Sequence, residues 1–87
     1  MKQFLPIGSV VLLKSSTKRV MIIGVKQKEA GSDKVWDYSG VYYPEGILDP
    51  EQLFLFGREQ IESLFFIGFQ DVEGLQFLQF LNNETEN

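Results

Sequence analysis

The first half of the chain alternates between short apolar runs and polar turns. Residues 9–14 and 19–25 are apolar runs of strand length, and the four polar residues between them predict a hairpin. A third strand is predicted over residues 35–43, where β-branched and aromatic side chains dominate. It should end at Pro44, which has no N–H to donate to a neighbouring strand. Gly40 inside this strand indicates a bulge or a close backbone approach.

The second half is less regular. Residues 51–56 fit either a strand or a turn followed by a strand. Residues 58–63 are polar apart from Ile61, and their composition predicts a short helix. The run at residues 64–70 is the most strand-like segment of this half.

A helix is predicted over residues 72–81, with Asp71 as its N-cap and Glu73 in its first turn. Its apolar side chains spread around most of the helix, although packing on a sheet needs only a stripe of roughly 100°. Two interpretations follow: the helix is held between the sheet and the short helix near Ile61, or it has an exposed apolar surface that pairs with a partner helix or a second copy. The apolar side chains that define this surface are Leu75, Phe77, Leu78, Phe80 and Leu81.

Together these segments predict one α+β domain over residues 1–87, with an ordered core at about 5–81 and a polar, fraying tail at 82–87. We expect about five short antiparallel strands in a twisted sheet or a partly open SH3-like barrel. The short helix near 58–63 and the C-terminal helix at 72–81 complete the expected fold.

The segment at residues 36–46 contains the only tryptophan and all three tyrosines of the chain. It fits a core strand with its turn, because most aromatic side chains are buried. It also fits a recognition rim formed by Tyr38, Tyr42, Tyr43 and Glu45, since tyrosine combines a large apolar area with a polar tip.

Composition argues against several chemistries. The chain has no cysteine and no histidine, so it lacks thiolate metal ligands, a disulfide framework and the commonest general base. The eight glycines match neither a phosphate-binding loop nor a dinucleotide fingerprint. We therefore expect no enzymatic activity, no catalytic residues, no metal and no cofactor. The absence of cysteine would be unusual in a small secreted protein, so a reducing cytoplasm is expected. The sequence also has no apolar run of membrane-spanning length, and its first residues do not resemble a signal peptide.

Charge is distributed unevenly. Residues 1–34 carry seven Lys or Arg and two Asp or Glu, a net charge of +5, whereas residues 35–87 carry one Arg and ten acidic residues, a net charge of −9. The overall charge of −4 argues against general nucleic-acid binding. The cations of the first half leave room for a local basic patch, and thus for a weaker RNA-binding alternative.

Four segments carry a family resemblance: LPIGSVVLLK at 5–14, MIIG at 21–24, DYSGVYYPEG at 37–46 and IESLFFIGF at 61–69. Together they resemble a small domain-of-unknown-function family of low-GC Gram-positive bacteria, whose genes often lie beside LXG-type polymorphic toxins and type VII secretion components. The resemblance covers about residues 5–81 and leaves the tail outside it.

The resemblance implies a cytoplasmic chaperone or adaptor that binds an LXG toxin or its helical targeting partners before export. It supplies no catalytic residues and does not say which face binds. The acidic second half leaves an immunity protein as the alternative, because an acidic surface could occupy a basic nuclease site. A homodimer through the C-terminal helix also remains open.

Overall fold

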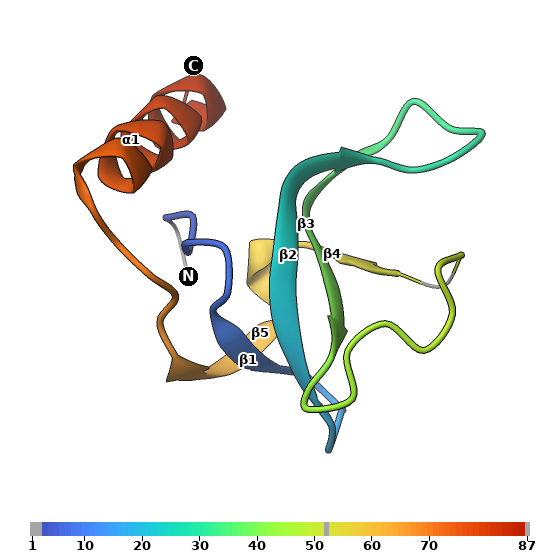
Figure 1. Cartoon of the computed structure of the whole chain (residues 1–87). Coiled ribbons are helices and arrows are strands. Elements are labelled where there is room, and N and C mark those ends of the chain that lie inside the picture. Colours follow the sequence, from blue (N-terminus) through green and yellow to red (C-terminus); the bar gives the residue numbers. More distant parts are fainter. Residues whose placement is uncertain (1–2, 52, 87) are drawn as a thin grey trace.

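The computed structural model describes residues 3–51 and 53–86, and these contain five strands, one 3-10 turn and one helix (Figure 1). In chain order the elements are β1 (Val10–Leu13), β2 (Arg19–Lys28), β3 (Val35–Tyr42), β4 (Phe54–Phe56), the 3-10 turn η1 (Arg58–Gln60), β5 (Ile61–Phe66) and α1 (Val72–Glu86).

The five strands form a single antiparallel sheet in the order β4-β3-β2-β1-β5. Within the described residues β4 and β5 are the two edges and do not pair with each other, so the sheet is open. This confirms the predicted α+β fold with about five antiparallel strands. The short helix predicted near residues 58–63 is the single turn η1.

The hairpin of β2 and β3 is the longest pairing in the sheet, and β2 curves strongly along it (Figure 1). The register shifts between Ile22 and Gly24, which places a bulge at that point of β2. Gly40 is buried opposite Ile22, and a Cβ at this position would meet the Met21 carbonyl oxygen at 2.9 Å. The close backbone approach predicted at Gly40 is therefore confirmed.

The ambiguous segment at residues 51–56 contains the short strand β4 at its end. Phe54 pairs with Gly40, and Phe56 pairs with Tyr38 and is buried in the core. The residues at both ends of the strand thus pair with β3, and Glu51 lies in the turn that precedes it; Gln52 lies outside the described residues.

The strand predicted at residues 64–70 is found but begins and ends earlier, since β5 runs from Ile61 to Phe66 and shares only residues 64–66 with the prediction. Ile61 is buried and pairs with Leu13, so the chain enters the sheet directly after η1. Beyond Phe66 the chain leaves the sheet and crosses the turn before β1. There the Gly68 N–H donates a hydrogen bond of 2.9 Å to Ser9 Oγ, and a Cβ on Gly68 would collide with the Ile7 carbonyl.

Helix α1 starts at Val72, as predicted, but it continues to Glu86 instead of ending at Leu81. No glycine or proline follows Leu81 to stop it, and the Asn82 side chain is bonded to the N-terminal segment. Residues 82–86, which were expected to form a polar tail, are helical in the structure, and their fraying stays a prediction; Asn87 lies outside the described residues.

The N-terminal segment lies between α1 and the sheet (Figure 1). It contributes Phe4 and Leu5 to one hydrophobic core, while α1 contributes Leu81. The helix is thus joined to the sheet through residues 4 and 5, and it leaves most of its own surface uncovered. The buried members of this core are Phe4, Leu5, Val11, Val20, Ile22, Tyr38, Phe56, Ile61 and Leu81.

Candidate functional site

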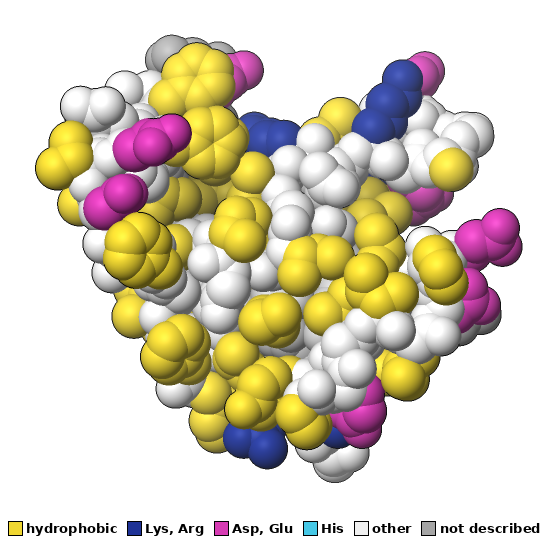
Figure 2. Space-filling view, in the orientation of Figure 1, with side chains coloured by type: hydrophobic (Ala, Val, Ile, Leu, Met, Phe, Trp, Pro, Cys, Tyr) yellow, Lys and Arg dark blue, Asp and Glu magenta, His cyan; other side chains and the backbone are white. Residues whose placement is uncertain are grey.

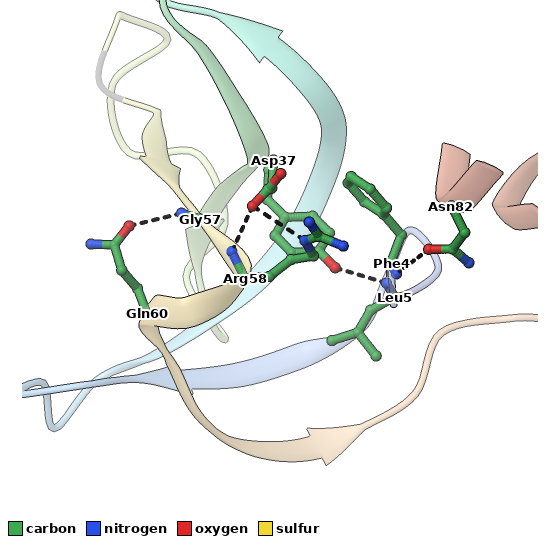
Figure 3. A network of polar contacts seen from close by, with 8 residues as sticks. Phe4, Leu5, Asp37, Gly57, Arg58, Gln60 and Asn82 are labelled. Atoms are coloured by element: carbon green, nitrogen blue, oxygen red, sulfur yellow. Dashed lines mark hydrogen bonds and ion pairs between the residues drawn. The ribbon is translucent and has the colours of Figure 1, made fainter. Parts of the chain in front are cut away.

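Two backbone hydrogen bonds fix the N-terminal segment on which the helix rests. The Phe4 N–H donates to Asn82 Oδ1 at 3.0 Å, and the Leu5 N–H donates to the Tyr38 hydroxyl at 2.8 Å (Figure 3). The Phe4 ring packs edge-on against Tyr38, with ring centroids 5.6 Å apart. These contacts attach the segment to both α1 and β3, so it forms the support on which α1 rests.

A charged pair borders this support. The Arg58 N–H donates to Asp37 Oδ2 at 2.8 Å, and the Arg58 side chain forms an ion pair with the same oxygen at 3.4 Å (Figure 3). The Arg58 guanidinium also lies 4.7 Å from the centroid of the Phe4 ring. Burial raises the pKa of the Tyr38 phenol, although the hydrogen bond from Leu5 opposes this shift.

Helix α1 rests on this support through Leu78 and Leu81. At 100° per residue, Phe77 and Phe80 lie to one side of this contact, whereas Val72 and Leu75 lie to the other. We call these two sides the Phe77 flank and the Leu75 flank. All four side chains are about half exposed or more, so the helix carries apolar surface on both sides of its buried face.

A cavity of about 450 Å³ opens beside the Phe77 flank, between α1 and the turn before β1. Its lining is mostly apolar, and Asp71 and Glu73 are the only charged residues among those described as lining it. We call it the Phe77 groove. The residues that line it are Leu5, Pro6, Ile7, Val25, Phe69, Asp71, Glu73, Gly74, Phe77 and Leu78.

A second cavity, of about 840 Å³, lies beside the Leu75 flank. Its apolar floor includes Phe4, Leu5 and Ile67, and its border consists of the amides of glutamine and asparagine. The two cavities therefore share the N-terminal segment but differ in their polar borders, which are acidic in the first and uncharged in the second.

The apolar surface continues from the helix to the edge strand. Figure 2 shows apolar side chains spread over this face, with acidic side chains between them at the helix in the upper left. The exposed fraction is 81% for Phe69 and 61% for Phe66. The exposed residues that make up this surface are Phe65, Phe66, Ile67, Phe69, Val72, Leu75, Phe77 and Phe80.

Sequence reasoning missed the β5 part of this surface. It interpreted residues 64–70 as a strand and did not treat its aromatic side chains as a binding surface. The available signal was the adjacent aromatic pair Phe65 and Phe66 in a strand-like run. In the structure both side chains line one cavity, next to a register shift between β1 and β5.

A third cavity, of about 370 Å³, is centred on Arg19 at the outer face of the sheet. The Arg19 guanidinium lies 5.3 Å from the centroid of the Tyr43 ring and 5.7 Å from that of Phe65. Tyr43 and Phe65 are both exposed, so this cavity continues the apolar surface at the end of β5.

The three tyrosines of the predicted recognition rim differ in burial and do not form one surface. Tyr38 is fully buried, so it is part of the core and not of a rim, because β2, β4 and the N-terminal segment cover it. Tyr42 is half-buried against Phe54, with ring centroids 4.6 Å apart. Tyr43 is exposed beside Arg19.

Glu45 is the acidic member of this rim. It is exposed and forms a 2.6 Å ion pair with the Lys18 ammonium, and the hydrogen bond from Lys18 lowers the pKa of Glu45. The Glu45 side chain therefore joins the turn after β3 to the turn between β1 and β2. Figure 1 shows both turns at the end of the sheet that lies away from α1.

The predicted helix residues also fall into two groups. Leu75, Phe77 and Phe80 are exposed, and they remain available for a partner. Leu81 is buried and Leu78 packs half-buried against the core, so these two hold the helix in place. The helix is not held between the sheet and η1, as the first interpretation expected, because it rests on residues 4 and 5. It also has the exposed apolar side chains that the second interpretation expected, and their pairing with a partner stays a prediction.

Within residues 3–51 and 53–86, no three acidic side chains gather closely enough to hold a metal ion. Among the same described residues, no helix is both long and apolar enough to cross a membrane. What the arrangement does offer chemically is a broad apolar contact surface with acidic groups at the helix.

Comparison with known proteins gives one match. The family model described as domain of unknown function (DUF4176) matches residues 4–77, which is most of the chain. No curated protein and no solved structure matches the chain. The chain therefore belongs to the DUF4176 family, a family defined by its sequence and not by an activity.

Proposed function

We propose that this protein is a non-enzymatic, cytoplasmic protein-binding module that acts as a chaperone or adaptor for an LXG-type toxin exported by a type VII secretion system. The observation that carries the protein-binding part is the set of exposed aromatic side chains on β5, on the segment after it and on α1, where Phe65 and Phe66 line one cavity and Phe69 and Phe77 line another. Contiguous exposed apolar patches mark interaction sites in soluble proteins.

The accessible surface supports the same proposal. It measures 5979 Å² for a chain of 10.0 kDa, whereas a monomer of this mass is expected to expose about 5,200 Å². The difference of about 700 Å² is close to the ~800 Å² that one partner buries in a standard interface. Helix α1 contributes to this surface, since Leu75, Phe77 and Phe80 are exposed on it. Figure 1 shows the helix joined to the sheet by the N-terminal segment.

The toxin as partner is supported by the sequence resemblance over residues 5–14, 21–24, 37–46 and 61–69. A chaperone that holds an export substrate needs a broad apolar contact and no catalytic group, and the exposed surface on β5 and α1 meets that need. The segments that carry the resemblance include the end of β5, where this surface begins.

An immunity protein is the second candidate. The net charge of −9 over residues 35–87 favours it, because an acidic surface complements the basic site of a nuclease. RNA binding has less support, since Lys18 is paired with Glu45 and Lys28 with Asp33.

The test is co-purification with the toxin encoded beside the gene, with the N-terminal and C-terminal halves of the toxin expressed separately. The proposal expects retention by the N-terminal half. Retention by the C-terminal half alone would replace it with the immunity function, and retention by neither half would contradict both. Phe66→Glu should abolish retention, whereas Leu48→Glu, at an exposed residue of the loop before β4, should not.

A further inference from the structure

The Phe77 flank combines aromatic and acidic side chains in one line along α1. Glu73, Phe77, Phe80 and Glu84 are spaced i, i+4, i+7 and i+11, so they share one side of the helix. The two phenylalanine rings stack at a centroid distance of 6.4 Å and an interplanar angle of 26°. The line runs for about 16 Å, with a carboxylate at each end.

The groove beside this line is apolar and acidic. Ile7, Val25 and Phe69 supply apolar walls opposite Phe77, and Glu73 stands at the rim. Asp71 also lines the groove, and its carboxylate accepts a 2.8 Å hydrogen bond from the Gly74 N–H as the cap of α1. Lys26, the neighbour of Val25 in β2, is not among the lining residues, and its ammonium lies 5.3 Å from the centroid of the Phe4 ring.

The acidic residues near the groove indicate the charge of the segment that it binds. From residue 59 to the end of the chain there are six Asp or Glu and no Lys or Arg. A second copy that docked the same flank would bring its own carboxylates against Glu73 and Glu84, which is unfavourable. A segment with Lys or Arg beside its apolar side chains would complement both features.

The spacing of the aromatic and acidic side chains along α1 indicates that the bound segment is a helix. Two large side chains flanked by charges over about three helical turns match the repeat of an amphipathic helix, whose apolar residues recur at i, i+3, i+4 and i+7. We propose that the Phe77 groove binds an amphipathic helix of a partner protein, with apolar side chains on the groove and Lys or Arg against Glu73 and Glu84. This deepens the proposed function by naming the chemistry of the bound segment.

The experiment measures binding of the full chain to labelled synthetic peptides by fluorescence anisotropy at about 0.15 M salt. The probe is a peptide of roughly 18 residues, about five helical turns, with leucine at the amphipathic positions and lysine elsewhere. One comparison peptide carries glutamate in place of lysine, and another has the lysine peptide's composition in scrambled order. The lysine peptide should bind at least about tenfold more tightly than either.

Protein variants locate the site. Phe77→Asp should weaken binding of the lysine peptide by about tenfold or more, whereas Leu48→Asp, at a more exposed apolar residue in a distant loop, should leave it unchanged. The double variant Glu73→Lys/Glu84→Lys should weaken binding strongly. Its control, Glu51→Lys/Glu59→Lys, changes the net charge by the same amount at exposed positions away from the groove and should have little effect.

Three outcomes would overturn the inference. Equal effects of the two double variants would show a general attraction between opposite charges. If the scrambled peptide bound as tightly as the lysine peptide, the protein would not be recognising the amphipathic pattern of a helix. A dimer in sedimentation that Phe77→Asp dissociates would assign the groove to a second copy. If the toxin is still retained in any of these cases, the proposed function stands and only the chemistry of the groove fails.

Discussion

The Oδ1 atom of Asn82 accepts a hydrogen bond from the backbone N–H of Phe4 at 3.0 Å, although the two residues are 78 positions apart. The bond holds the last turns of α1 against the segment that enters the core. Because α1 touches the rest of the molecule mainly through Leu78, Leu81 and this bond, Asn82 helps to set the position of the whole helix.

Truncation after Leu81 should therefore destabilise the protein. Loss of the Asn82 bond and of the final helical turn should lower the free energy of unfolding by about 1 to 2 kcal/mol, measured by urea denaturation. Truncation after Asn83 keeps the bond and is the control, with an expected change below about 0.5 kcal/mol. Equal urea midpoints for the two truncated chains would show that Asn82 contributes nothing.

Tyr38→Phe removes one oxygen from the centre of the core. The Leu5 N–H then loses its acceptor in a buried position, and an unsatisfied buried donor costs about 1 to 3 kcal/mol. For a domain of this size each kcal/mol lowers the melting temperature by roughly 4 to 8 °C. Tyr42→Phe is the matched control because Tyr42 is only half-buried, and a similar loss from both variants would contradict the assignment.

The same phenol makes stability depend on alkaline pH. Burial raises the pKa of Tyr38 in the folded protein, so the unfolded chain loses this proton first as the pH rises. The stabilising contribution is complete below the ordinary tyrosine pKa of about 10 and is lost as the pH rises from there towards the folded pKa. Absorbance at alkaline pH should show Tyr42 and Tyr43 ionising reversibly, with Tyr38 following only on unfolding.

The ion pair between Lys18 and Glu45 predicts a local change in titration. The hydrogen bond from Lys18 lowers the pKa of Glu45, so its contribution is present above the unfolded pKa and is lost as the pH falls through the folded value. Lys18→Met should return the pKa of Glu45 towards the ordinary value, as followed by carboxyl NMR. An unchanged titration curve in Lys18→Met would mean that the pair does not persist in solution.

The local patterns in the sequence were sufficient to predict the strands and the start of the helix. Apolar runs bounded by turn residues identified β1 and β2, and β-branched and aromatic residues identified β3. Asp71, as the N-cap, identified the start of α1 at Val72. Each of these signals is local, because it lies within a few residues of the strand or helix that it predicts. The end of α1 was missed because the contact that accompanies it, from Asn82 to Phe4, is distant in sequence.

The candidate surface was predicted only in part for a similar reason. Leu75, Phe77 and Phe80 were identified because an over-apolar helix has more apolar surface than one contact can cover. Alternation alone did not reveal that Tyr38 lies under the N-terminal segment, nor that Phe66 and Phe69 lie at an uncovered edge. Both facts depend on where the two ends of the chain pack.

Substitutions on α1 should separate its supporting face from its exposed flank. Leu81→Ala removes a buried side chain of the core and should lower the free energy of unfolding by about 2 to 5 kcal/mol. Phe77→Ala removes a side chain that is 48% exposed and should change stability much less, while it should weaken partner binding. Urea denaturation of both variants tests the first statement, and co-purification with the toxin tests the second. If Phe77→Ala unfolds the domain as readily as Leu81→Ala, then Phe77 belongs to the core in solution and the flank offers no separate surface to a partner.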